Sequence, residues 1–225
     1  MSHRIFPTRV VLLDWDGTLL DSYASDKNAY CAMFRALKIE WGVAEIERHY
    51  SPDWYRVYRA ARIPRSNWAR ADQLWRAAYR SQRPCLLAGA RRVLRELDRR
   101  FDLGLVTSGS GARVRKQLRE FGFRQYFHAC ICSEDAPRRK PHPAPIQLAL
   151  KAMKAQPDEC VYVGDTPEDV EMARRAGVRV IGVLGPFPTA VRLRAARPDL
   201  LLRSIQELPK HLAVLPQSEP VLSSS

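Results

Sequence analysis

The strongest constraint on the fold is a set of short apolar runs separated by segments with helical periodicity. Strands that alternate with helices are joined by right-handed crossovers, so the strands run parallel and helices cover both faces of the sheet. We therefore predict an α/β fold with a Rossmann-like parallel sheet as its core. The predicted strands are RVVLLD (9–14), DLGLVTS (102–108), HACICS (128–133), CVYVGD (160–165) and VRVIGV (178–183).

The interval 22–83 interrupts this alternation, because it has no convincing strand and several long helical stretches rich in Trp, Tyr and Arg. We predict that it forms an inserted helical subdomain, while 1–21 and 84–215 form the α/β core. The stretch 216–225, PQSEPVLSSS, has the composition of a disordered tail. We expect the tryptophans of the insert to form its small core and not to stack on a substrate; they are Trp41, Trp54, Trp68 and Trp75.

The net charge of +13 comes mainly from arginine and is compatible with a nucleic-acid partner or an anionic substrate. The arginines are spread along helical segments such as ARRVLRELDRR, which is typical of a solvated helix face, so we expect no nucleic-acid partner. The longest apolar runs are too short to cross a bilayer, and MSHRIFPTR lacks the apolar centre of a signal peptide. We therefore expect a cytoplasmic protein without a membrane partner.

The five cysteines show no paired zinc-type spacing and mostly stand among apolar residues. This pattern indicates free buried thiols and not disulfides or a metal site. Cys130 and Cys132 are two residues apart in a predicted strand, so we expect both side chains on one packed face.

Polar side chains follow several predicted strands at the point where each strand ends. Asp14 and Asp16 come directly after the first run, and Gly17 lets the backbone bend away behind them. Asp165 ends the fourth run, and Asp169 follows it by about one helical turn. Because ligands of open α/β sheets bind outside the carboxyl ends of the strands, these groups should meet at one edge. Oxygen donors without His or Cys suit Mg²⁺, so we predict a magnesium site there.

The stretch LVTSGSGARV predicts a phosphate site, because a strand leads into two hydroxyls, two glycines and a helix. We expect Thr107, Ser108 and the free amides of the loop from Gly109 to Gly111 to contact phosphate oxygens at the helix N-terminus. The alternative, a dinucleotide-binding fingerprint, fits poorly because Val114 stands where its third glycine belongs.

Lys140 lies in the proline-rich loop SEDAPRRKPHPAP after the third predicted strand. Taken alone, a lysine beside two arginines is usually a solvated loop residue, and we expect Arg138 and Arg139 to be solvated. A fixed ammonium near several carboxylates would offset their repulsion and the charge of a phosphoryl group. We therefore predict that Lys140 belongs to the site.

These four motifs, in this order over about residues 8–185, resemble those of the haloacid dehalogenase superfamily. DWDGT matches its first motif, LVTS its second, Lys140 in KPHPAP its third and VGDTPED its fourth. The helical insert is similar to the family's small cap of type C1. An acid at the position of Asp16 resembles the phosphatase and phosphomutase branches, because the dehalogenase and phosphonatase branches lack one there. Thr18 favours the phosphatase branch. The resemblance is greatest to the phosphoglycolate phosphatase branch.

The resemblance implies a role for each matching residue. Asp14 would be the nucleophile that forms an aspartyl-phosphate, and Asp16 would be the general acid and base. Thr107 and Lys140 would hold the phosphate. The implied metal ligands are Asp14, the backbone carbonyl of Asp16, Asp165 and, as a second acidic partner, Asp169.

We therefore predict a Mg²⁺-dependent phosphatase that hydrolyses a small phosphorylated metabolite. Two alternatives stay open: a phosphomutase of the β-phosphoglucomutase type, which shares all four motifs, and a non-catalytic protein that binds phosphorylated ligands. The sequence leaves open the identity of the metabolite and the choice between a monomer and a homodimer. It also leaves open whether a series of arginines in the insert reaches a second anionic group of the substrate or forms an exposed helix face; these are Arg56, Arg59, Arg62 and Arg65.

Overall fold

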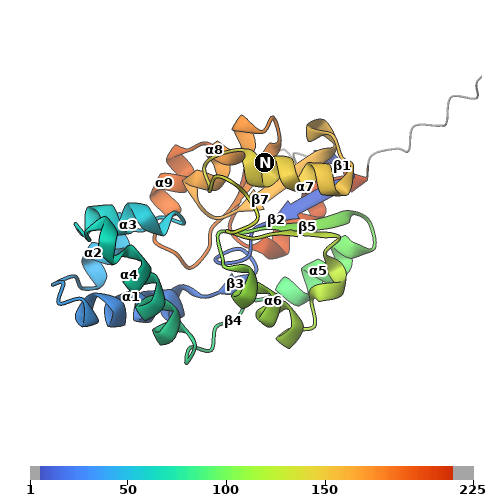
Figure 1. Ribbon diagram of the computed structural model, residues 1–225. Helices are drawn as coiled ribbons and strands as arrows, with labels where there is room; N and C mark the ends of the chain where they lie inside the picture. The colour runs from blue at the N-terminus through green and yellow to red at the C-terminus, as the bar shows by residue number, and fades with distance from the viewer. Residues whose placement is uncertain (1–5, 215–225) are drawn as a thin grey trace, which may run out of the picture.

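The computed structural model describes residues 6–214, so the predicted tail at 216–225 lies outside the described residues. Its centre is a six-stranded parallel sheet in the order β6–β5–β2–β7–β8–β9 (Figure 1). Each apolar run predicted to be a strand contributes one, which confirms the α/β fold with a parallel sheet. These strands are β2 (Val10–Leu13), β5 (Asp102–Val106), β6 (Ala129–Ile131), β7 (Cys160–Gly164) and β8 (Arg179–Val183).

The sheet has one strand that sequence analysis does not predict. It is β9 (Leu200–Leu202), which pairs with β8 at the edge of the sheet and is only partly buried. Two short ladders lie outside the main sheet. One pairs β1 (Phe6–Thr8) with β10 (Leu212–Val214) in parallel, and the other pairs β3 (Leu20–Asp21) with β4 (Cys85–Leu86) antiparallel.

Helices cover both faces of the sheet. Alternate residues of the central strand β2 point to opposite sides, so each face has its own apolar layer. Val11 and Leu13 of β2 pack with one set of helices, and Val10 and Leu12 pack with the other. Within residues 6–214, every helix falls short of the length and apolarity that a bilayer span requires. The first face carries α5 (Ala90–Asp98) and α6 (Gly111–Glu120), and the second carries α7 (Ala144–Met153), α8 (Pro167–Arg175) and α9 (Ala190–Ala195). Short 3-10 helices are η1 (Arg65–Asn67), η2 (Arg124–Tyr126), η3 (Pro157–Glu159) and η4 (Ile205–His211).

The interval predicted to be a helical insert contains four α-helices, drawn blue to teal beside the sheet in Figure 1. These helices enclose an apolar core of their own, which includes Met33, Phe34 and Tyr58. The chain enters them just after β3 and leaves them just before β4, and these two strands pair with each other. The division at residues 22 and 83 stays a prediction. The helices are α1 (Tyr23–Ala36), α2 (Val43–His49), α3 (Trp54–Ala60) and α4 (Trp68–Tyr79).

The tryptophans of the insert only partly follow the prediction that they form its core. All four pack against the apolar core of the insert. The Trp41 ring stacks on His49 with centroids 5.1 Å apart, and the Trp68 ring stacks on Tyr55 at 4.5 Å. The other two, Trp54 and Trp75, also line a cavity between the insert and the sheet.

The cysteines of the described chain are free, as predicted, but the prediction that they are buried is wrong for Cys85, which is exposed. The sulfur atoms of Cys130 and Cys132 lie 3.7 Å apart, and both residues belong to the layer that α5 and α6 cover. The two side chains therefore share one packed face of β6 and its extension.

Candidate active site

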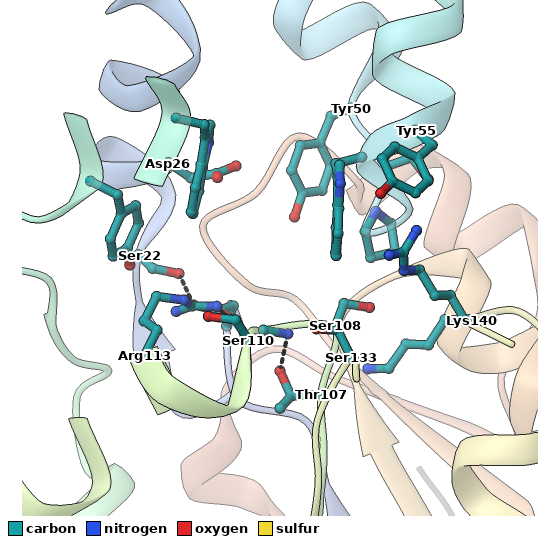
Figure 2. A pocket seen from close by; sticks show the side chains of 18 of the residues that line it. Ser22, Asp26, Tyr50, Tyr55, Thr107, Ser108, Ser110, Arg113, Ser133 and Lys140 are labelled. Atoms are coloured by element: carbon teal, nitrogen blue, oxygen red, sulfur yellow. Dashed lines mark hydrogen bonds and ion pairs between the residues drawn. The ribbon is translucent and has the colours of Figure 1, made fainter. Parts of the chain in front are cut away.

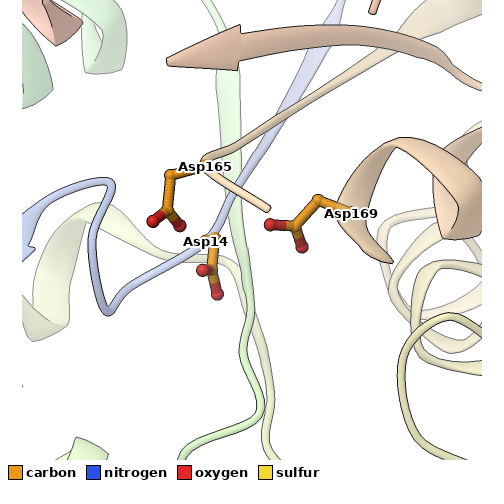
Figure 3. A group of neighbouring side chains, drawn as sticks. All are labelled: Asp14, Asp165 and Asp169. Atoms are coloured by element: carbon orange, nitrogen blue, oxygen red, sulfur yellow. The ribbon is translucent and has the colours of Figure 1, made fainter. Parts of the chain in front are cut away.

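Three carboxylates meet at the carboxyl edge of the sheet (Figure 3). Asp14 follows β2, Asp165 follows β7, and Asp169 lies in the first turn of α8. One oxygen of each lies within 4.8 Å of the others, and all three residues are buried. Like charges at this separation repel, so the cluster requires nearby positive charge. The structure thus brings together three of the predicted metal ligands.

Asp165 shows that the cluster fits a hard divalent cation. Its Oδ2 atom is buried without a hydrogen-bond partner in the described chain, and burial raises its pKa well above the usual value. Gly17, at φ +84°, lies so close that a Cβ atom there would stand 2.2 Å from this oxygen. Thr18 makes only a long hydrogen bond of 3.5 Å to the other oxygen. An unpaired buried carboxylate oxygen among others is a suitable ligand for Mg²⁺, so Asp14, Asp165 and Asp169 are suited to hold it.

Lys140 lies between two of these carboxylates. Its Nζ atom is 2.8 Å from Asp14 Oδ1 and 2.8 Å from Asp169 Oδ1, and the residue is 3% exposed. Burial alone would lower the pKa of Lys140, but the two carboxylates outweigh burial and raise it. Burial raises the pKa of Asp14, and the ammonium group opposes that rise. Lys140 therefore supplies the positive charge that sequence analysis expects of it.

Sequence analysis missed Tyr162, which links the lysine to the cluster. Its hydroxyl oxygen lies 2.7 Å from Lys140 Nζ, 2.9 Å from Asp169 Oδ1 and 3.1 Å from the carbonyl oxygen of Val106. These contacts fix the positions of Lys140 and Asp169 relative to each other. The available signal is a tyrosine in the otherwise apolar run CVYVG, because a buried hydroxyl needs a partner.

The carboxylate of Asp16 lies outside the three-carboxylate cluster and binds Arg113 of α6. The two guanidinium nitrogens are 2.6 and 2.9 Å from its oxygens, and the Ser22 hydroxyl donates to it at 2.7 Å. Burial alone would raise the pKa of Asp16, but the Arg113 guanidinium holds that pKa below its usual range. Only the backbone carbonyl of Asp16 is predicted to bind metal, and that role stays a prediction.

Thr107 and Ser108 follow β5 and line the cavity together with Gly109 (Figure 2). The Gly109 N–H donates to Thr107 Oγ1 at 3.0 Å, and the Gly111 N–H donates to Glu134 Oε2 at 2.9 Å. The two glycine amides predicted to contact phosphate therefore already have partners in this structure. The Ser108 hydroxyl is buried and has no partner within residues 6–214, so it is free to bind an anion.

None of the four insert arginines considered in the sequence lines the cavity above the carboxylates. The side chains of Arg56 and Arg59 are 50% and 57% exposed, and both pair with Asp53. This series therefore forms an exposed face, one of the two alternatives that the sequence leaves open. The arginines that do line the cavity are Arg76, Arg113 and Arg139.

The prediction that Arg139 is a solvated neighbour of Lys140 is wrong. Its guanidinium carbon lies 4.0 Å from the ring centroid of Trp54 and 4.3 Å from that of Tyr55. A planar guanidinium covers aromatic faces in this way, which explains why the residue is partly buried. Arg138, by contrast, is exposed as predicted.

Comparison with known proteins agrees with the motifs and the fold. The haloacid dehalogenase-like hydrolase family matches residues 11–183. A pyrophosphatase PpaX of Bacillus pumilus is 32% identical over 140 residues, which cover 60% of this chain and 65% of that protein. A phosphoglycolate phosphatase of Nitrosococcus oceani is 25% identical, with 88% and 94% of the two chains covered. A solved structure of a predicted phosphoglycolate phosphatase from Haemophilus somnus has a TM-score of 0.81 at 18% identity, covering 93% and 98%. Because the family match extends over well more than half of its length, the chain belongs to the haloacid dehalogenase-like hydrolases.

Proposed function

We propose that the protein is a Mg²⁺-dependent phosphatase that hydrolyses a small phosphorylated metabolite through an aspartyl-phosphate. The observation that carries this proposal is the buried cluster of Asp14, Asp165 and Asp169 with Lys140 between two of its members. Phosphoryl transfer needs an oxygen nucleophile and positive charge around the transferring group, and these residues supply both. The names of the relatives, pyrophosphatase and phosphoglycolate phosphatase, also support it.

In this proposal Asp14 attacks phosphorus, and the bond from phosphorus to the leaving oxygen breaks. Asp16 protonates that oxygen and then, as a carboxylate, accepts a proton from the water that hydrolyses the aspartyl-phosphate. Arg113 favours the ionised form of Asp16, which is the form that activates water. Protonation of the leaving oxygen then requires that Arg113 release Asp16 when the substrate binds.

Positive charge and hydrogen-bond donors surround the phosphoryl group in the same proposal. Lys140 offsets its charge, and the hydroxyls of Thr107 and Ser108 bind its oxygens. Asp14, Asp165 and the carbonyl of Asp16 would hold Mg²⁺, with Asp169 beside them. When bound, Mg²⁺ supplies positive charge that neutralises the phosphoryl oxygens and favours the ionised carboxylates.

A phosphate-release screen over small phosphorylated metabolites, with Mg²⁺ and with excess chelator, tests this proposal. We expect release of inorganic phosphate that depends on Mg²⁺. Isomerisation of a sugar phosphate without phosphate release would instead identify a phosphomutase, and tight binding without turnover would identify a non-catalytic protein. A cytoplasmic site of action and the oligomeric state stay predictions to be tested separately.

A further inference from the structure

The cavity above the carboxylates has walls that are largely aromatic. Asp14, Asp16, Lys140 and the Thr107 loop form its floor, and the helical insert supplies most of its walls. Figure 2 shows Tyr50 and Tyr55 on the insert side, opposite the loop that carries Ser108 and Ser110. Rings from several elements contribute: Tyr50, Trp54, Tyr55, Trp75, Tyr79 and Phe187.

The cavity has a volume of about 170 Å³. A cavity of about 150 Å³ is large enough to bind an aromatic ring such as benzene. The space above the floor is therefore large enough for a planar ring.

The aromatic rings that line the cavity are arranged in stacked pairs. Tyr50 stacks on Phe187 with centroids 4.7 Å apart and an interplanar angle of 27°, and Trp75 stacks on Tyr79 at 4.7 Å and 23°. Tyr50, Tyr79 and Phe187 lie outside the apolar core of the insert, whereas Trp75 packs against that core and also lines the cavity. Stacked aromatic walls of this kind bind planar rings, because every planar base has a π-face.

The walls carry polar groups of both charges, because Arg76 and Arg139 line the cavity as well as Asp26 and Asp72. The Trp54 indole N–H is buried and has no hydrogen-bond partner within the described part of the chain. A buried donor without a partner is unfavourable, so a ring nitrogen or carbonyl of a ligand would satisfy it. Asp26 and Asp72 can accept hydrogen bonds from ring amino groups, and Arg76 and Arg139 can donate to ring nitrogens and carbonyl oxygens.

We infer that the substrate is a phosphate monoester whose alcohol carries a planar nitrogen heterocycle, as in a nucleoside monophosphate. This inference rests on the proposed phosphatase function and names its substrate class. The phosphate would lie on the floor at Asp14 and Lys140, and the heterocycle would lie between the aromatic walls with Trp54 donating to it. Hydrolysis consumes one water and yields the nucleoside and inorganic phosphate.

Matched pairs of esters test this inference. Ribonucleoside 5′-monophosphates and ribose 5-phosphate share the sugar and the phosphate and differ only in the base. We expect kcat/KM in Mg²⁺ to be about tenfold or more higher for the preferred nucleotide, which is the size of one base stacked on an aromatic side chain. Equal values would overturn the inference and leave the phosphatase proposal intact. Failure to hydrolyse any ester, nitrophenyl phosphate included, would overturn both.

Variants locate the effect in the walls of the cavity. Trp54→Leu should reduce the ratio of nucleotide to ribose 5-phosphate kcat/KM by about tenfold, because it removes the free indole donor that would bind the heterocycle. Trp41→Leu is the matched control, since Trp41 belongs to the same insert but does not line the cavity. If Trp54→Leu fails to fold by circular dichroism, Tyr50→Leu replaces it. A ratio that stays at the parent value in the folded wall variant would overturn the inference.

Discussion

Arg113 donates a hydrogen bond from each of two guanidinium nitrogens to the carboxylate of Asp16, at 2.6 and 2.9 Å. Arg113 also donates to Gln117 at 3.2 Å, and Gln117 accepts the indole N–H of Trp15 at 2.9 Å. One helix, α6, therefore holds two adjacent residues of the DWDGT stretch. Bidentate pairs of this kind fix the orientation of a carboxylate as well as its charge.

Arg113→Met should lower the free energy of unfolding at pH 7 by about 2 kcal/mol, because it leaves the half-buried Asp16 without its main partner. The pKa of Asp16 is below its usual value of 3.8, so the pair stabilises the fold above that pH and loses this effect as pH falls through the lower, folded pKa. Urea denaturation at a series of pH values should show the difference between the two proteins shrinking below about pH 4. A difference independent of pH would refute the ionic role.

Substitutions of the two aspartates of DWDGT should block different steps of the reaction. Asp14→Asn should release no nitrophenolate from nitrophenyl phosphate, because the nucleophile is gone. Asp16→Asn should give a burst of about one equivalent per site and then slow turnover, because this leaving group scarcely needs a proton but the second step needs a base. Rapid-mixing absorbance measures both.

An alkyl phosphate is the control for this experiment, because its leaving oxygen needs a proton and the Asp16→Asn burst should disappear. Parent turnover by Asp16→Asn, or a burst from Asp14→Asn, would show that the assigned roles are wrong. Circular dichroism should accompany both variants, since Asp16→Asn also weakens the contact with Arg113.

Lys140→Met should lower kcat by about 10²-fold or more, because it removes a fixed cation from the transferring phosphoryl group. It should also destabilise the metal-free protein by about 3–5 kcal/mol, since Asp14 and Asp169 lose their buried partner. The exposed Arg138 is the matched control, and Arg138→Met should change both quantities little. Steady-state kinetics and denaturation measure the two effects. Similar small losses of kcat and of stability in both variants would indicate that Lys140 is only a solvated loop residue.

Mg²⁺ should raise the melting temperature of the parent protein, because a ligand that binds only the folded state stabilises it by about 2.7 kcal/mol at 100 times Kd. Asp165→Asn should abolish most of this rise, since it removes the charge of the unpaired buried carboxylate. Asp158→Asn, at an exposed aspartate, should retain the rise. Differential scanning fluorimetry with and without Mg²⁺ compares the three proteins, and an equal rise in all of them would contradict the assigned site.

The sheet is predictable from the sequence because most of its strands are largely buried apolar runs with helices between them. In β2 and β7 every residue is buried, so apolar character alone marks them. The edge strand β9 has three residues and only Leu202 is fully buried, so neither length nor pattern distinguishes it from a loop. Short edge strands exist through pairing with a neighbour, which is a tertiary contact.

The candidate site is predictable where a residue follows a strand directly. Asp14 and Asp165 belong to that class, because the topology of a parallel sheet already places strand ends together. Tyr162 and Arg113 do not, since their importance comes from contacts with Lys140 and Asp16, which are distant in sequence. Periodicity gives the face on which such a side chain lies but not the residue that it meets.

The paired strands β3 and β4 bring the two ends of the helical insert next to each other, with Leu20 opposite Leu86 and Asp21 opposite Cys85. A segment whose ends are already joined can change in length at little cost, about 0.6 kcal/mol for each doubling of a flexible loop. The paired strands β3 and β4 therefore allow natural selection to exchange or remodel the insert without rebuilding the sheet that carries the aspartates. Enzymes built this way can acquire new substrates by replacing one module while the chemistry is inherited unchanged.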